Sequence, residues 1–310
     1  MDTIPLPFGG ALQVAVSALA RDALSVGLDG TLPTNQHYQS EYGIGAGTLQ
    51  RALDQLRSRR VLKTTSRGHL GRVVTALNIA GAWRAGALDP VRVVLPPAGP
   101  VEITMLQLVV AEALSKLGIP HTARNLRAAS TRLALLQQGE ADLAVVSTGG
   151  LSGADRPFLS RSLGVGTYYG LDRIAVVSRR DETAPRRLIA IDRDSPDHRA
   201  ITHGEFPIDD GYTYVQVPFP HIPAAVLAKR VDAGIWHITP SVIPLDQAGI
   251  KLGSLTTHAG ITAWANASEA VLAVGPMRPE LNSVIMAMDM TELARRQADA
   301  IAADTGLVPD

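Results

Sequence analysis

The stretch that decides the fold of the N-terminal part comprises residues 32–74, LPTNQHYQSEYGIGAGTLQRALDQLRSRRVLKTTSRGHLGRVV. Thr34 is a typical N-cap residue, so a short helix is expected to follow it and to run through Tyr42. The glycines at Gly43 and Gly45 end that helix and place a turn before the next one. Two helices joined by a short turn are therefore expected here.

The second helix is expected to begin near residues 46–48, with the Thr48 side chain serving its first turn. Its apolar residues recur at helical spacing and share one face, as Leu49, Ala52, Leu53 and Leu56 do. The polar and basic side chains lie mostly off that face: Gln50, Arg51, Gln55, Arg57, Arg59 and Arg60. They are free to bind phosphates and base edges, which is what a helix that reads a DNA groove requires.

A hairpin is expected to follow over residues 61–75, with glycines at a tip that carries Arg67 and His69. The whole chain has a formal net charge of zero, yet residues 51–72 hold seven Arg or Lys and one acid, Asp54. A local basic stripe on a neutral protein favours a docking surface for nucleic acid. The alternative is an ordinary solvated helix followed by an ordinary hairpin.

The order of these motifs resembles the DNA-binding domain of GntR-type bacterial regulators, in residues 32–34, 47–56 and 67–68. The resemblance implies an α+β winged helix-turn-helix domain and operator binding. The candidate DNA-binding residues are Thr34, Gly47, Thr48, Gln50, Arg51, Lys63, Arg67 and His69. The chain departs from that family at Gly45-Ala46, where Ser-Arg is common, and at Gln50, where an Arg is common. For this reason no operator sequence is carried over.

Composition sets limits on the rest of the chain. With 310 residues, 46% of them hydrophobic, the chain is long enough for two or three cores. It has no cysteine, which excludes disulfides, thiolate chemistry and cysteine-bound zinc. The N-terminal segment predicts an amphipathic helix interrupted by Arg21 and Asp22, not a signal peptide. Because no apolar run approaches about 18 residues, no membrane span is expected, and the protein is predicted to be cytoplasmic.

Three regions are expected: residues 1–77 as the winged helix-turn-helix domain, 78–90 as a linker and 91–310 as a two-lobed α/β domain. Trp83 lies within the predicted linker. We expect it to pack between the two domains, with packing on a second subunit as the alternative.

From Val91 onward, apolar strands alternate with helices. Strands are expected at residues 91–95, 121–128, 141–148, 187–192, 212–218 and 231–236, with helices between them at 102–117, 130–138, 195–204 and 222–230. This alternation favours parallel sheets covered on both faces, arranged in two lobes. Segments 169–178 and 267–275 are predicted to cross between the lobes, before a C-terminal helix at 280–302. A double crossover makes a hinged cleft, in which small ligands bind.

Residues 132–147 and their shorter counterpart at 228–236 are similar to the helix, Gly, Asp, strand element of type 2 periplasmic-binding-protein domains. Together with the N-terminal part, the chain resembles the YhfZ type of regulators over nearly its full length. That resemblance implies a regulator with a ligand-binding domain and names no ligand.

Ligands of open α/β sheets bind outside the carboxyl ends of the strands. This rule selects Pro97, Gly99, Ser130, Thr131, Ser147 and Thr148 in the first lobe, and Asp192, Ser195, Trp236 and His237 in the second. The hydroxyls and amides favour an anionic effector, whereas Trp236 and His237 suit a ring or an amine. The alternatives are that Ser130 and Ser195 are only helix caps and that Trp236 belongs to the core.

No catalytic residues, metal site or cofactor are predicted. The eight histidines are scattered, and no metal-binding spacing, P-loop or dinucleotide fingerprint occurs. Ser195 lies beside Asp194 and near His198, but neighbours at a helix start point in different directions. The predicted protein is therefore not an enzyme and binds double-stranded DNA and a small effector; that it is a homodimer is implied by its resemblance to regulators that bind symmetric operators. The alternatives are a cytoplasmic binding protein whose first domain only dimerises, and a two-lobed enzyme.

Overall fold

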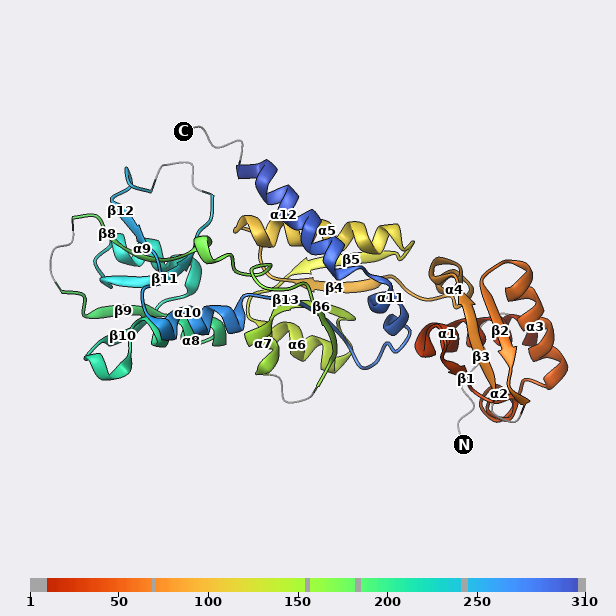
Figure 1. The fold of residues 1–310 in the computed structure, drawn as a ribbon. Helices are drawn as coiled ribbons and strands as arrows, with labels where there is room; N and C mark the ends of the chain where they lie inside the picture. Colours follow the sequence, from red (N-terminus) through yellow and green to blue (C-terminus); the bar gives the residue numbers. More distant parts are fainter. Residues whose placement is uncertain (1–9, 69–70, 154–156, 182–184, 241–244, 306–310) are drawn as a thin grey trace.

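The computed structural model describes residues 10–68, 71–153, 157–181, 185–240 and 245–305. Three parts follow one another along the molecule in Figure 1: the N-terminal domain at the right, a first lobe in the middle and a second lobe at the left. No helix within these ranges is long and apolar enough to cross a bilayer.

The N-terminal domain packs three helices against a small antiparallel sheet of strand order β1-β3-β2. Its elements are α1 (Ala11–Val26), β1 (Thr31–Leu32), α2 (Asn35–Tyr42), α3 (Ala46–Ser58), β2 (Leu62–Ser66) and β3 (Arg72–Leu77). Thr34 caps α2 by accepting a hydrogen bond from the His37 amide at 3.3 Å. Gly43 ends α2 in the left-handed conformation at φ 65°. Thus both ends of the first predicted helix are confirmed.

The first lobe has a five-stranded sheet of order β5-β4-β6-β13-β7. Its elements are β4 (Val91–Leu95), α5 (Val101–Lys116), β5 (His121–Asn125), α6 (Ala129–Gln138), β6 (Leu143–Ser147), α7 (Thr148–Ser152), β7 (Leu159–Ser162) and β13 (Ala270–Val274). The predicted parallel pairing is confirmed for β5, β4 and β6, whereas β13 pairs antiparallel with both β6 and β7, so the sheet is mixed. The chain returns from the second lobe into β13, which runs in the direction opposite to β6 and β7.

The second lobe has its own sheet of order β10-β9-β11-β8-β12, in which β8 and β12 are again antiparallel to their neighbours. Its elements are β8 (Ile174–Arg179), β9 (Leu188–Ile191), α8 (Pro196–Glu205), β10 (Thr213–Gln216), α9 (Ile222–Leu227), β11 (Ala233–His237), β12 (Ile250–Gly253) and α10 (His258–Ala267), with 3-10 turns at Leu171–Arg173, Ile208–Asp210 and Phe219–His221. The chain enters this lobe at β8 and returns to the first lobe at β13, so the two predicted crossings are confirmed.

The predicted linker at 78–90 contains a helix, α4 (Ile79–Ala85), whose first turn is capped by Asn78. Trp83 on this helix is only 1% exposed. It belongs to a single apolar cluster that runs from α1 and α3 through α4 into β4, α5 and β6 of the first lobe. The second lobe has separate clusters on the two faces of its own sheet. The N-terminal domain and the first lobe therefore form one packed body, to which the second lobe is attached.

The C-terminal part strengthens this junction. The single helix predicted at 280–302 is instead two helices, α11 (Leu281–Ala287) and α12 (Met290–Thr305), because Met288 is extended between them. The short helix α11 lies against α1, where the Ser283 hydroxyl donates to the Leu24 carbonyl. In Figure 1, α12 lies beside α5 above the first-lobe sheet, while α6 and α7 cover its other face.

Candidate DNA-binding face and interlobe site

The helix α3 buries Leu49, Ala52, Leu53 and Leu56 and exposes the opposite side, as its spacing predicted. At its start, a side chain at Gly45 or Gly47 would meet nothing within 4 Å, so the backbone of the first turn is open. Thr48 is not a cap, since no side chain caps α3. Its hydroxyl instead accepts a hydrogen bond from Arg51 at 3.2 Å.

The hairpin of β2 and β3 is connected to α3 by a hydrogen bond from Arg72 to the Gln50 side chain at 3.1 Å. The exposed cations of α3, of the turn that follows it and of the hairpin are Arg51, Arg57, Arg59, Arg60, Lys63 and Arg67. Arg57 is paired with Asp54 at 3.0 Å, which leaves it less free. Thr34 is used as the α2 cap, and His69 lies outside the described residues. The result is an open helix start beside a hairpin that carries exposed cations.

At the opposite end of the molecule's packed body, the two lobes meet through polar side chains. Ser147 ends β6 in the first lobe, caps α7 by accepting from the Gly150 amide at 3.0 Å, and donates its hydroxyl to Asp197 of the second lobe. Asp197 also accepts from the Tyr169 hydroxyl at 3.2 Å. A Cβ on Gly149 would collide with the Asp197 carboxylate, so glycine allows this close approach.

Two further contacts bridge the lobes. Glu102 on α5 meets Nε2 of His237 on β11 at 3.2 Å, with both side chains almost fully buried. Burial alone would raise the pKa of Glu102, but the hydrogen bond and charge of His237 and two backbone hydrogen bonds hold the pKa below its ordinary value. Arg127 of the first lobe meets Asp192 of the second at 3.2 Å. Asp192 also accepts from the Phe219 amide at 2.8 Å.

Asp197 differs from these paired acids. Burial raises the pKa of its carboxyl, and this effect outweighs the hydrogen bonds from Ser147 and Tyr169 and the charge of Arg132. One oxygen, Oδ1, is buried and has no hydrogen-bond partner among the described residues. The nearby His198 is held neutral, because burial lowers its pKa to about 4. Its Nδ1 accepts from the Asp192 amide and its Nε2 donates to the Ile235 carbonyl.

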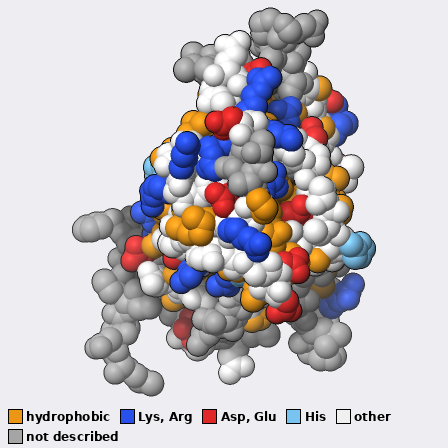
Figure 2. All heavy atoms as spheres, turned by 90° about the vertical axis from the view of Figure 1, so that its left-hand side faces the viewer, with side chains coloured by type: hydrophobic (Ala, Val, Ile, Leu, Met, Phe, Trp, Pro, Cys, Tyr) orange, Lys and Arg blue, Asp and Glu red, His pale blue; other side chains and the backbone are white. Residues whose placement is uncertain are grey.

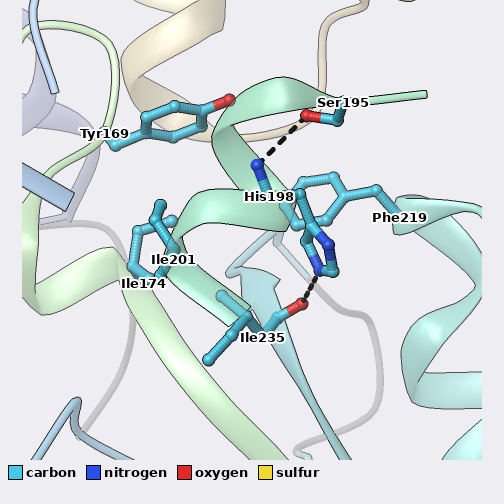
Figure 3. A pocket seen from close by; sticks show the side chains of 7 residues that line it. All are labelled: Tyr169, Ile174, Ser195, His198, Ile201, Phe219 and Ile235. Atoms are coloured by element: carbon cyan, nitrogen blue, oxygen red, sulfur yellow. Dashed lines mark hydrogen bonds between the residues drawn. The ribbon is translucent and has the colours of Figure 1, made fainter. Parts of the chain in front are cut away.

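A small cavity of about 10 Å³ lies beside this cluster, within the second lobe. Figure 3 shows its lining, with the Tyr169 hydroxyl directed toward the start of α8 and the Phe219 ring on the other side of His198. A cavity of this size holds about one water molecule. The cavity is thus too small for an organic ligand, and because the lobes contact one another through Ser147, Glu102 and Arg127, such a ligand would require them to separate.

The predicted ligand residues are divided between the interlobe surface and other places. Ser147, Asp192, Ser195 and His237 lie at or beside it, and Ser195 caps α8. Pro97 and Gly99 lie in the loop after β4, and Gly99 is near Thr239 of the second lobe. The Thr148 hydroxyl donates to the Glu269 carbonyl. Trp236 packs in the second-lobe core.

The expected capping by Ser130 is wrong. The N-cap of α6 is Ala128, at φ 59°, and no side chain caps this helix. Ser130 and Thr131 are exposed on its first turn. The helix N-terminus here is therefore formed by strained backbone, without the hydroxyl that the sequence suggested.

Sequence reasoning missed Glu102, Arg127, Tyr169 and Asp197 as members of the interlobe cluster. An acidic residue in the first turn of a helix is ordinary, so Asp197 carried no special signal. Glu102 lies in the first turn of α5 in the same way. Only the approach of the two lobes gives these residues their partners.

Comparison with known proteins agrees with the observed architecture. Residues 80–305 match the family model described as YhfZ C-terminal domain, and residues 30–74 match one described as Helix-turn-helix domain. The crystal structure of YhfZ from Shigella flexneri is similar at a TM-score of 0.57 and 21% identity, covering 73% of this chain and 96% of that one. No curated protein matches.

Two other solved structures are more distant. The aliphatic sulphonate binding protein SsuA from Escherichia coli has a TM-score of 0.46 and 15% identity over 71% of this chain and 80% of its own. An OxyR mutant from Corynebacterium glutamicum has a TM-score of 0.44 and 17% identity over 100% of this chain and 98% of its own. With its family match over residues 80–305, the chain belongs to the YhfZ family; in this chain a helix-turn-helix domain precedes a two-lobed α/β domain.

Proposed function

We propose that this protein is a bacterial transcriptional regulator that binds operator DNA through its N-terminal domain and senses a small molecule between the lobes of its C-terminal domain. The observation that carries the proposal is the exposed, basic side of α3 beside the β2–β3 hairpin, in front of a domain built like a ligand-binding protein. It acts as a homodimer in the cytoplasm, where its DNA is found.

DNA binding would use α3 in the major groove and the hairpin against the phosphates. The open backbone at Gly45 and Gly47 lets the helix start approach the duplex closely. Arg51 and Gln50 lie on the exposed side of the same helix, and Arg67 lies at the hairpin. Arginine side chains of this kind contact base edges and phosphates.

Effector binding would act by changing the position of the second lobe. Since the N-terminal domain shares one apolar core with the first lobe, those two parts move together. The interlobe contacts include the polar pairs Ser147–Asp197, Arg127–Asp192 and Glu102–His237, so a ligand that separates or re-closes the lobes reorients the second lobe against the DNA-binding domain. In a dimer, this reorientation would change the spacing of two DNA-binding domains.

The first experiment is a fluorescence-anisotropy titration of the protein against duplexes that flank its own gene, at two salt concentrations, with random DNA as competitor. Specific binding that survives the competitor supports the proposal. Weak binding that salt abolishes, with no preference for any duplex, contradicts operator recognition. It would favour the alternative of a small-molecule-binding protein without specific DNA binding.

Two variants locate the contact surface. Arg51→Ala is expected to weaken specific binding by about 1–3 kcal/mol if the side chain contacts a base edge. Arg67→Ala is expected to weaken binding to all sequences alike and to reduce the salt slope by about 1. The matched control is Arg187→Ala, an exposed arginine of the second lobe, which should leave DNA binding unchanged.

A further inference from the structure

The interlobe cluster also indicates the chemical class of ligand that it accepts. The side chains that face each other there include three buried carboxylates, those of Glu102, Asp192 and Asp197. Glu102 is paired with His237 and Asp192 is paired with Arg127. Asp197 has no ion-pair partner within the described part of the chain, although the residue is only 6% exposed.

The unpartnered oxygen of Asp197 requires a hydrogen-bond donor. Ser147 and Tyr169 both donate to Oδ2, and Oδ1 is left without one. A buried acceptor without a donor costs free energy, more so when it is charged. His198, one residue further along α8, does not supply the proton, because both of its ring nitrogens are engaged by backbone groups.

An anionic ligand does not suit this position. A carboxylate of the protein already accepts the Ser147 hydroxyl at the start of α7, where an effector anion had been expected to bind. Arg132, whose charge lowers the pKa of Asp197, is held by the Val145 and Leu126 carbonyls and by the Tyr168 hydroxyl. A second anion would therefore meet like charge without a free cation to offset it.

Aromatic rings complete the surroundings. Tyr169 contacts Asp197 through its hydroxyl; it also lines the small cavity together with Phe219, although Asp197 is not part of that lining (Figure 3). Rings beside a carboxylate are the usual surroundings of a bound ammonium group, because the ring faces attract the cation. We propose that the interlobe site binds a small cationic molecule whose ammonium group donates to Oδ1 of Asp197, on the side that faces Gly149, and lies beside Tyr169 as the lobes close.

This inference rests on the proposed effector site between the lobes, and it narrows the effector to amines. The bound ammonium supplies the donor that Oδ1 lacks and the positive charge that the carboxylate lacks. In the ligand-bound closed state, Asp197 would make a charge-assisted hydrogen bond to the ammonium group. In the closed state without ligand, it contacts neutral groups only.

The test is a thermal-shift titration of the full-length protein with methylammonium, butylammonium and putrescine, and with acetate, butyrate and phosphate as anionic counterparts. At least one amine is expected to raise the melting temperature of the wild type in a saturable manner, while the anions do not. In Asp197→Asn, which keeps the size of the side chain and removes its charge, the amine is expected to bind about 10- to 100-fold more weakly.

The matched control is Asp194→Asn, which removes one exposed carboxylate from the same segment and should bind amines like the wild type. A second variant, Gly149→Ala, keeps Asp197 but places a methyl group against its carboxylate, and is also expected to lose amine binding. Equal amine binding by the wild type and Asp197→Asn overturns the inference, as does an absence of any amine response. An anion that stabilises the wild type more than the amines also overturns it.

The same proteins are assayed for DNA binding, so that the two proposals are judged separately. Specific DNA binding without an amine response would leave the regulator intact and refute the amine. An amine response that depends on Asp197, without specific DNA binding, would support the ligand class and contradict the regulatory role.

Discussion

The junction between the N-terminal domain and the first lobe differs in its contacts from the junction between the two lobes. The N-terminal domain meets the first lobe through apolar side chains, with Trp83 buried among residues of both. The first lobe meets the second through Ser147 and Asp197, Glu102 and His237, and Arg127 and Asp192. An apolar junction loses its full burial energy when it opens, whereas polar groups regain hydrogen bonds from water. The first junction is therefore suited to fix a position and the second to open and close.

The surfaces differ in the same way. On the end of the second lobe shown in Figure 2, cationic and anionic side chains are interspersed. Around α3 and the hairpin, exposed cations predominate. Mixed charge maintains solubility, while a cluster of one sign attracts a partner of the other. This contrast supports the proposal that DNA binds at the N-terminal end of the molecule.

The largest effect is expected from Trp83→Ala at the apolar junction. Removing a buried tryptophan costs about 3–5 kcal/mol, and the loss should affect the N-terminal domain and the first lobe together. The matched variant Trp236→Ala, in the second-lobe core, should mainly destabilise that lobe. Differential scanning calorimetry on both variants separates the transitions. If Trp83→Ala lowered the stability of the N-terminal domain alone, the shared core would not behave as one body.

A smaller effect is expected from His237→Ala at the polar junction. The change leaves Glu102 buried without its partner, and breaking a buried pair costs about 3–5 kcal/mol before relaxation. Because the lobes can separate and hydrate Glu102, we expect about 1–3 kcal/mol and a more open molecule. Small-angle scattering should show a larger radius of gyration than in the wild type. An unchanged radius together with full destabilisation would mean that the lobes do not open.

The next prediction is a gain in stability. Asp197→Asn removes a buried charge without removing the oxygen that accepts from Ser147, so the ligand-free variant should be about 1–2 kcal/mol more stable at pH 7. Since burial raises the pKa of Asp197 in the folded state, its charge is costly above that pKa, and the cost disappears as pH falls toward 3.8. Urea unfolding of both proteins at pH 7 and pH 4 should show the difference shrinking. A difference that grows at low pH would contradict the raised pKa.

The smallest effect on stability is expected from Arg67→Ala. The side chain is exposed at the hairpin, so the free energy of unfolding should change by less than about 0.5 kcal/mol. Chemical denaturation checks this value on the same sample used for DNA binding. A large loss of stability would mean that any loss of DNA binding reflects unfolding of the hairpin.

Much of the fold could be predicted from local signals. Thr34 and Gly43 fixed the ends of α2, and the spacing of Leu49 to Leu56 fixed the buried side of α3. The alternation of strands and helices indicated two α/β lobes, and both crossings were placed correctly. Ser195 was recognised as a possible cap, and it caps α8. These features depend on residues close together in the chain.

The errors occurred where distant segments meet. Ser130 has the chemistry of a cap, but the backbone at Ala128 takes the cap position instead. The strand β13 begins 123 residues after β6 ends, and its antiparallel pairing with β6 depends on the path of the whole second lobe between them. Trp236 and His237 are adjacent, yet one packs in the second-lobe core and the other meets Glu102, because neighbouring strand residues face opposite sides.

The sequence by itself determined the domain order, most of the helices and strands, and the basic character of α3 with its hairpin, because periodicity, caps and charge are local properties. Only the tertiary structure decided that the N-terminal domain and first lobe share a core, and that Asp197 is buried against Ser147 with one oxygen unpartnered. Those properties depend on which surfaces come into contact, since burial and the loss of water change the energy of a side chain that looks ordinary in the chain.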